Sequence, residues 1–357
     1  MLDSNAGRMN YRRNSVLHNE TGGDVMLTRR RVITLASAAA ATLAMPNISR
    51  AAPINMRLAH AANEIHPGHV AAVEFKKALE ALVPGATNLT IFPNRQLGED
   101  RQNLESAIAG TNELCGCSGV LFPLVTGRNA LDAYQLPFLI KDYDHFSRIA
   151  TADIGQKLLD DLEPAGLVGV QTTDIGQRHF LCATREVKSV PDFAGLKTRI
   201  LPVPLHKAIW EGVGTAPIGL PYGEVYGALE TKVIDAVEIN VSSMLGENLW
   251  EVGKNFTLTG HYPWHNVIAI NKTFFDGLPT EIQQAIKQAG RDSIAPTLEY
   301  TKKQDHEGRD ELRAKGVQIF ELENLAGMQA KVEPIIEQWS SKSPLIKEFV
   351  GQARTLT

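Results

Sequence analysis

The feature that most constrains the fold is a regular alternation of predicted strands and helices that begins at Ile54. Three short segments have the apolar content of strands: residues 54–59, 89–92 and 113–117. Between them lie two segments with helical periodicity, residues 67–82 before Pro84-Gly85 and residues 99–109 before Gly110. Strands separated by helices in this way favour a parallel-type sheet covered by helices on both faces. The predicted fold class is therefore α/β.

The alternation repeats in the second half of the chain. Further strands are predicted at residues 168–172, 179–183, 198–200 and 236–239, and helices at residues 205–211 and 222–231. A long helical region opens at Thr280, with Gln283 three residues later in a capping-box pattern, and reaches about Lys315. Pro296 predicts a kink or break inside it.

Two α/β sets joined by strands and a long helix indicate two lobes with a cleft between them, and such a cleft is the default ligand site. We expect domain I to comprise residues 53–173 and 266–305, and domain II to comprise residues 174–265 and 306–357.

The N-terminal segment has the order of an export signal. Met26 is followed by three arginines at 29–31, an Ala-rich apolar stretch from Val32 to Met45, and small residues at Ser49 and Ala51. We expect residues 1–25 to be an extension upstream of a true start at Met26, and cleavage after Ala51 to release a periplasmic protein. The arginines fit both a twin-arginine signal and an ordinary secretory signal, so both export routes stay open. A cytosolic disordered arm would leave this ordering unexplained.

The charge of the mature chain argues against nucleic acid as a partner. Removing residues 1–51 removes seven of the 36 Lys and Arg and three of the 40 Asp and Glu, which leaves a formal charge of −8. No basic run remains. No later segment is apolar enough to span a bilayer, so the mature chain is expected to be soluble, and a monomer.

The sequence offers no recognisable catalytic, cofactor or metal motif. A nucleophile elbow, a phosphate-binding glycine loop and a dinucleotide fingerprint are all missing from it. His66 and His69, and His261 and His265, have the nearest spacing to metal ligands, but local spacing fixes no acidic third ligand. The cysteines fit buried apolar positions better than a disulfide or zinc: Cys115, Cys117 and Cys182.

Two arginines carry the most functional information. Arg178 begins one predicted strand and Arg199 lies on another, and both strands are apolar around the arginine. A guanidinium in that setting often binds a planar anion, because its fork donates two parallel hydrogen bonds to a carboxylate. An internal pair with an aspartate or glutamate explains the pattern equally well.

A series of short motifs in order resembles the solute-binding proteins of the tripartite ATP-independent periplasmic (TRAP) transporters, a family with dicarboxylate- and sialic-acid-binding members. The resemblance covers essentially the whole mature chain. The motifs are His66-Pro67, Phe92-Pro93-Asn94, Gln96-Leu97-Gly98, Gly176-x-Arg178, Gly195-Leu196-Lys197-Thr198-Arg199, Glu224-Val225-Tyr226-Gly227-Ala228-Leu229, Asp235-x-x-Glu238, and Asn271-Lys272 before Leu278-Pro279.

The resemblance implies a two-domain periplasmic binding protein fold with a central ligand cleft, hinge strands and a long helix spanning the lobes. It implies that Arg199 makes the main bidentate contact with a ligand carboxylate, that Arg178 lines the same cleft and that Tyr222 packs on the ligand. The remaining candidate ligand-binding residues are His60, Ser118, Glu238, Ile239, Asn240 and Trp264. The implied partners are the ligand and the small and large membrane subunits of the transporter.

The chain departs from the family pattern at positions that bear on the ligand. Ile239 stands where an asparagine usually binds the ligand, and Asn240 comes one residue later, which in a strand turns the side chain to the other face. Ser118 and Leu121 lack the charged groups found in sialic-acid binders. With Ile239 and Leu121 placed near the cleft, a compact hydroxy-, keto- or aromatic monocarboxylate is favoured over a sugar acid.

Two other functions are compatible with parts of the sequence. A binding protein of an ATP-driven importer would share the two lobes but would not supply this series of motifs. An exported metal-dependent hydrolase would use the paired histidines. The motifs favour the non-enzymatic TRAP binding protein over both.

Overall fold

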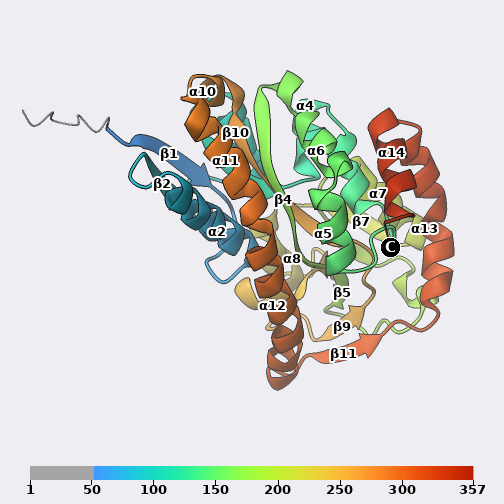
Figure 1. Ribbon diagram of the computed structural model, residues 1–357. Coiled ribbons are helices and arrows are strands. Elements are labelled where there is room, and N and C mark those ends of the chain that lie inside the picture. Colours follow the sequence, from blue (N-terminus) through green and yellow to red (C-terminus); the bar gives the residue numbers. More distant parts are fainter. Residues whose placement is uncertain (1–51, 357) are drawn as a thin grey trace, which may run out of the picture. The chain divides into compact units, whose positions relative to one another are not determined.

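Two β-sheets organise the structure, a computed structural model that describes residues 52–356 (Figure 1). The predicted export signal and the start at Met26 lie outside the described residues. Within residues 52–356, no helix is long and apolar enough to cross a membrane.

The first sheet has five strands in the order β2-β1-β3-β10-β4. The elements predicted from Ile54 onward are confirmed: β1 (Ile54–Ala59), α2 (Pro67–Leu82), β2 (Thr87–Phe92), α3 (Asp100–Ile108) and β3 (Leu114–Ser118). β1 is parallel to both β2 and β3, as expected. However, β10 (Pro263–Asn271) lies antiparallel between β3 and β4 (Leu167–Gln177), so the sheet is mixed.

Helices cover both faces of the first sheet. On one face, α2 and α11 (Thr280–Asp292) pack in a core that includes Phe75 and Ile286. The other face is covered by helices and short 3₁₀ turns from a segment in which no elements were predicted from the sequence. They are α4 (Leu121–Thr126), η1 (Ala130–Gln135), α5 (Tyr143–Thr151), α6 (Asp153–Asp160) and η2 (Glu163–Ala165). α10 (Lys272–Asp276) follows β10.

The second sheet has six strands in the order β11-β9-β5-β8-β6-β7. They are β5 (His179–Cys182), β6 (Lys197–Ile200), β7 (Ala216–Gly219), β8 (Ala236–Ile239), β9 (Asn255–Leu258) and β11 (Gln318–Glu321). The central strand β5 is antiparallel to β8 and β9. Its helices and turns are η3 (Val190–Phe193), α7 (Pro204–Val213), η4 (Tyr222–Glu224), α8 (Val225–Glu230), α9 (Val241–Gly246), α13 (Leu325–Ser340) and α14 (Pro344–Ala353).

The chain passes between the sheets at three places. Only Arg178 separates β4 from β5, β9 leads into β10, and α12 (Ile294–Ala314) contacts β4 as well as α9 and β11 (Figure 1). The predicted interruption of the long helix occurs at Ser293, so that Pro296 lies in the first turn of α12, where a missing N–H is harmless. The predicted capping box at Thr280 is wrong: Pro279 is the N-cap, and Gln283 instead donates to the carbonyls of Asp276 and Leu278.

The domain boundaries given above stay a proposal. β4 and β10 remain paired as far as Gln177 and Pro263, slightly beyond the proposed limits of domain I. In addition, α13 contacts α7, whereas α14 contacts η1 and α6. The three cysteines are buried with free thiols, which confirms that they serve as small core residues.

Candidate functional site

A cavity lies between the two sheets. Its first wall consists of residues at the carboxyl ends of β1 and β3, the starts of α2 and α3, and β10, including His60, His66, Asp100, Ser118, Trp264 and Asn266. Its second wall includes Arg178, Arg199, Leu201, Tyr222 and Ser243. The volume is about 50 Å³, enough for only a few water molecules. The walls must separate to admit an organic ligand.

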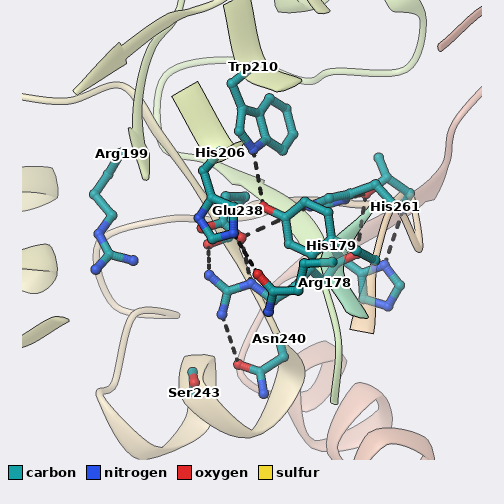
Figure 2. A network of polar contacts seen from close by, with 12 residues as sticks. Arg178, His179, Arg199, His206, Trp210, Glu238, Asn240, Ser243 and His261 are labelled. Atoms are coloured by element: carbon teal, nitrogen blue, oxygen red, sulfur yellow. Dashed lines mark hydrogen bonds and ion pairs between the residues drawn. The ribbon is translucent and has the colours of Figure 1, made fainter. Parts of the chain in front are cut away.

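Arg178 is buried and already paired within the protein. Its Nε donates to Oε2 of Glu238 at 2.5 Å, its Nη2 donates to the carbonyl of Glu238, and its Nη1 lies 3.5 Å from Oδ1 of Asn240 (Figure 2). The ring of Trp264 lies beside the guanidinium, with Cζ 3.9 Å from its centroid, a cation–π contact. Arg178 therefore lines the cavity with its charge neutralised by a buried glutamate.

Arg199 is equally buried but pairs with no carboxylate among residues 52–356. Its Nε and Nη2 both donate to the carbonyl of Leu220, at 3.0 and 2.8 Å. Figure 2 shows its guanidinium apart from the Arg178–Glu238 network. Burial lowers the pKa of Arg199 to about 10, because desolvation of the charged form outweighs the attraction of nearby Glu238. This side chain is thus the cation available to an anionic ligand.

Glu238, Ile239 and Asn240 lie behind the cavity and do not line it. Glu238 is held by Arg178, and Ile239 packs in the hydrophobic core with Val237 and Met244. Asn240 follows β8 as the N-cap of α9, and its amide donates to the carbonyl of Ile175 at 2.8 Å. The premise that Ile239 makes the cavity apolar is therefore wrong. Leu121 also lies outside this cavity, in a neighbouring groove.

Two histidines on the first wall are neutral. His66 accepts from the N–H of Gly68 through Nδ1, and its Nε2 lies 3.1 Å from Oγ of Ser243 on the second wall. Nε2 of His60 lies 3.0 Å from Nδ1 of His69. Burial lowers the pKa of both His60 and His66 to about 3.

Asp100 is the one carboxylate among the lining residues. Its two oxygens accept from the backbone amides of Ala61 and Ser118, each at 3.2 Å. Burial raises its pKa to about 6 in spite of these bonds. Asp100 therefore carries most of a negative charge at neutral pH, on the wall opposite Arg199.

Several buried polar atoms at the cavity have no hydrogen-bond partner in the described part of the chain. They are His60 Nδ1, Ser118 Oγ, Tyr222 Oη and Asn266 Nδ2. Buried polar groups in folded proteins are nearly always paired, so a group of unpaired ones around a cavity favours a polar occupant. These donors and acceptors, beside an arginine and a carboxylate, suit a hydroxylated anion.

Six of the nine predicted site residues line the cavity: His60, Ser118, Arg178, Arg199, Tyr222 and Trp264. Their contact with a ligand stays a prediction. Sequence reasoning missed Asp100, Ser243 and Asn266. Asp100 could have been noticed, because it follows the Gln96-Leu97-Gly98 motif at a helix start. The other two follow from tertiary packing alone.

Nothing in the described part of the chain suggests a resident metal. Among residues 52–356, no three histidine, cysteine or acidic side chains gather to hold an ion. His261 and His265 instead lie in the core, where burial lowers the pKa of both.

The fold and the site together agree with one family. The sequence profile of the bacterial extracellular solute-binding proteins, family 7, matches residues 58–342. The chain belongs to this family, the solute-binding proteins of TRAP transporters.

This solute-binding protein aligns with nearly the whole length of three similar proteins. The C4-dicarboxylate-binding periplasmic protein DctP of Rhodobacter capsulatus is 28% identical over 321 residues, 89% of this chain and 96% of the relative. The sugar acid binding protein DctPAm of Advenella mimigardefordensis, solved with galactonate, superposes with a TM-score of 0.80 at 25% identity over 85% of this chain and 99% of that one. A TRAP solute-binding protein of a Bradyrhizobium species, solved with galacturonate, gives a TM-score of 0.80 at 26% identity over 84% and 99%. The two-domain fold implied by the sequence motifs is thereby confirmed.

Proposed function

We propose that this solute-binding protein captures a sugar acid with a single carboxylate in the periplasm and delivers it to the membrane subunits of a TRAP transporter. The observation that carries the proposal is Arg199, a buried cavity arginine without a carboxylate partner among residues 52–356. A carboxylate is the planar anion that matches its fork.

The balance of charges supports one carboxylate in the ligand. Glu238 neutralises Arg178, and the wall histidines His60 and His66 are uncharged. Arg199 then remains as the cation, and Asp100 stands on the opposite wall. A second ligand carboxylate would meet an anion there and lose affinity.

The unpaired polar atoms favour a hydroxylated ligand over a compact aromatic one. Ser118 Oγ, Asn266 Nδ2 and His60 Nδ1 each offer a hydrogen bond to a hydroxyl group, and Asp100 can accept further bonds. This revises the preference drawn from the sequence, which rested on Ile239 and Leu121 lining the cleft. The galactonate and galacturonate complexes of the two similar proteins agree with the revision.

The cellular role follows from the family. DctP of Rhodobacter capsulatus is periplasmic by name, and the export signal expected at residues 26–51 would place this chain in the same compartment. Opening and closing of the cleft would then present a loaded protein to the membrane subunits. We propose no catalytic role, and a sugar acid recovered chemically unchanged after prolonged incubation with the protein is the matching result.

The experiment is a thermal-shift screen of organic acids followed by calorimetric titration. Aldonates and hexuronates should raise the melting temperature, because a ligand at a hundredfold excess over its Kd stabilises the folded state by about 2.7 kcal/mol. Compact monocarboxylates, C4-dicarboxylates, neutral sugars and amino acids should give smaller shifts or none. Binding of a neutral sugar without any acid would refute the proposal.

The site is tested with Arg199→Lys and Arg199→Ala. Lysine keeps the charge but loses the bidentate fork, so binding should weaken clearly. Alanine should weaken it roughly hundredfold or more, corresponding to about 3 kcal/mol. The matched control is Arg101→Ala, an exposed arginine paired with Glu105 on its own helix, which should bind like the parent. If the folded Arg199→Ala variant binds the ligand with the affinity of the parent protein, another residue must bind the carboxylate.

A further inference from the structure

The loop between β2 and α3 holds an arginine in an unusual backbone conformation. Asn94 and Arg95 both have positive φ angles, 55° and 61°, in a backbone region that residues other than glycine and asparagine rarely adopt. The Asn94 N–H donates to the carbonyl of Ala62 at 2.9 Å, and the Arg95 N–H donates to that of His60 at 3.4 Å. The loop is thereby fixed against the chain segment that forms the first wall of the cavity.

From this loop the Arg95 side chain reaches the second wall. Its Nη2 donates to Oε1 of Glu247, just after α9, at 2.9 Å, while Nε lies 3.0 Å from Oε1 of Glu99 on its own side. Its Cζ lies 4.9 Å from the ring centroid of Tyr222, a cation–π contact. The Arg95 and Glu247 side chains are only 25% and 17% exposed, so solvent screens this ion pair less than a surface pair.

The two walls touch closely at this seam. A Cβ at Gly223, next to Tyr222, would come within 2.5 Å of Oε1 of Glu99 and 3.0 Å of Nε of Arg95. A Cβ at Gly246, next to Glu247, would come within 2.0 Å of Nδ2 of Asn63 on the first wall. A methyl group at either position would require the Glu99 or Asn63 side chain to shift.

We propose that Arg95 is a positioning residue that fastens the closed cleft by binding Glu247 and the ring of Tyr222 across the seam. Tyr222 lines the cavity, so the contact that holds its ring also shapes the ligand site. The inference rests on the proposed function in one respect, that a ligand enters when the cleft opens and is retained when it closes.

A contact that exists only in the closed form slows dissociation of the ligand and has little effect on its association. When the cleft opens, the contacts of Arg95 with Glu247 and with Tyr222 break at the same time. Neither contact exists while the ligand first binds. Loss of Arg95 should therefore raise the dissociation rate constant and leave the association rate constant nearly unchanged. High salt should mimic part of this effect, because it screens the ion pair.

The first test measures association and dissociation by stopped-flow tryptophan fluorescence with galactonate and galacturonate. We expect Arg95→Ala to raise the dissociation rate constant about tenfold and the association rate constant to change less than twofold. Arg95→Lys should recover part of the loss, and Glu247→Gln should raise the dissociation rate constant several-fold. The double variant should match Arg95→Ala, and Arg101→Ala should match the parent. A dissociation rate constant of Arg95→Ala within twofold of the parent, or additive effects in the double variant, would overturn the proposal.

The second test needs no ligand. The native cysteines are buried, so spin labels at Lys77→Cys on α2 and Glu230→Cys on α8, both exposed, can report the distance between the lobes. Arg95→Ala and 1 M NaCl should each shift the distance distribution of the ligand-free protein toward the open form, and Arg101→Ala should not. If neither acid binds the parent protein, the proposed ligand class fails, and this measurement still decides on Arg95: an unchanged distribution refutes its role.

Discussion

Removing the charge from each of the two buried arginines of the cavity should change folding stability to very different extents. We compare Arg199→Met with Arg178→Met in the ligand-free protein at pH 7. Methionine keeps much of the buried apolar volume and removes the charge in both cases. The difference between the two variants therefore reports how each charge is compensated.

For Arg199 the magnitude follows from its pKa. The folded-state value of about 10 lies about 2.5 below the ordinary value of 12.5, and one pKa unit corresponds to about 1.36 kcal/mol. The sign is unfavourable: at pH 7 both states are protonated, and the folded state holds the charge about 3 kcal/mol less well than water does. Against this gain, the variant loses the two bonds to the Leu220 carbonyl, worth about 1.5–3 kcal/mol. The net change should lie within about 1.5 kcal/mol of zero.

For Arg178 the same substitution leaves a charge behind. Glu238 is fully buried and would lose its only ion-pair partner among lysines and arginines in the described chain. Breaking a buried pair by removing one partner destabilises a protein by about 3–5 kcal/mol. In the double variant Arg178→Met, Glu238→Gln no charge is stranded, so at least half of that loss should return.

Urea unfolding followed by circular dichroism measures these free energies, with a constant m-value as the check on two-state behaviour. Equal destabilisation by Arg199→Met and Arg178→Met would refute the reasoning, because it would mean that Arg199 also has an internal ionic partner.

Three further outcomes are expected. Gly290→Ala should destabilise the fold by about 1–3 kcal/mol in urea unfolding, because its Cβ would lie 2.2 Å from the Val170 carbonyl oxygen. Gly351→Ala, at an exposed position of α14, should stabilise it by about 0.5–1 kcal/mol. Gly246→Ala should weaken ligand binding in calorimetry without loss of stability, because the added methyl group meets Asn63 only when the cleft is closed. Stability should fall steeply as the pH drops below 6.5, because histidines become protonated in the unfolded chain but stay neutral in the folded one. Burial lowers the folded-state pKa to about 3 for four of them, His60, His66, His179 and His265. It lowers the pKa of His206 and His261 well below the ordinary value too. Four carboxyls with raised pKa values take up protons in the folded state and oppose this loss: Asp100 and Asp132 near 6, Asp174 near 8, and Asp305. Counting the six histidines against Asp100, Asp132 and Asp174, the net difference near pH 5.5 is about three protons, or roughly 4 kcal/mol per pH unit in denaturant titrations at a series of pH values.

Local patterns were enough to predict the elements whose neighbours lie close in sequence. The segment from β1 to β3 is a simple strand–helix series, and its periodicity and its Pro and Gly stops gave the right elements. β10 was missed because nothing near residue 263 indicates that it will insert antiparallel between β3 and β4. The short strands β7, β9 and β11 were also missed. They are only partly buried, whereas the equally short β5 and β8 are buried throughout and have a clear apolar pattern.

The site shows the same division. The apolar strands around Arg178 and Arg199 marked both as buried. The internal pair is found for Arg178, whereas anion binding by Arg199, which donates only to the Leu220 carbonyl, stays a prediction. Which arginine has the internal partner depends on β5 pairing with β8, where Phe180 lies opposite Glu238. Strand alternation could not place the Asn240 side chain, because β8 ends at Ile239 and Asn240 is the N-cap of α9.

We propose that two opposing contributions at the cleft let a ligand control closure. The contacts of Arg95 with Glu247 and Tyr222 favour the closed form whether or not a ligand is present. Closure also buries Arg199 without a carboxylate in ion-pair contact, and the desolvation that lowers its pKa favours the open form. A bound carboxylate compensates the buried charge of Arg199 and so removes the contribution that favours the open form. The contacts of Arg95 remain, and they then shift the equilibrium toward the closed form. A neutral sugar of equal size would leave Arg199 uncompensated, which is a physical reason for the cleft to close on acids and not on sugars.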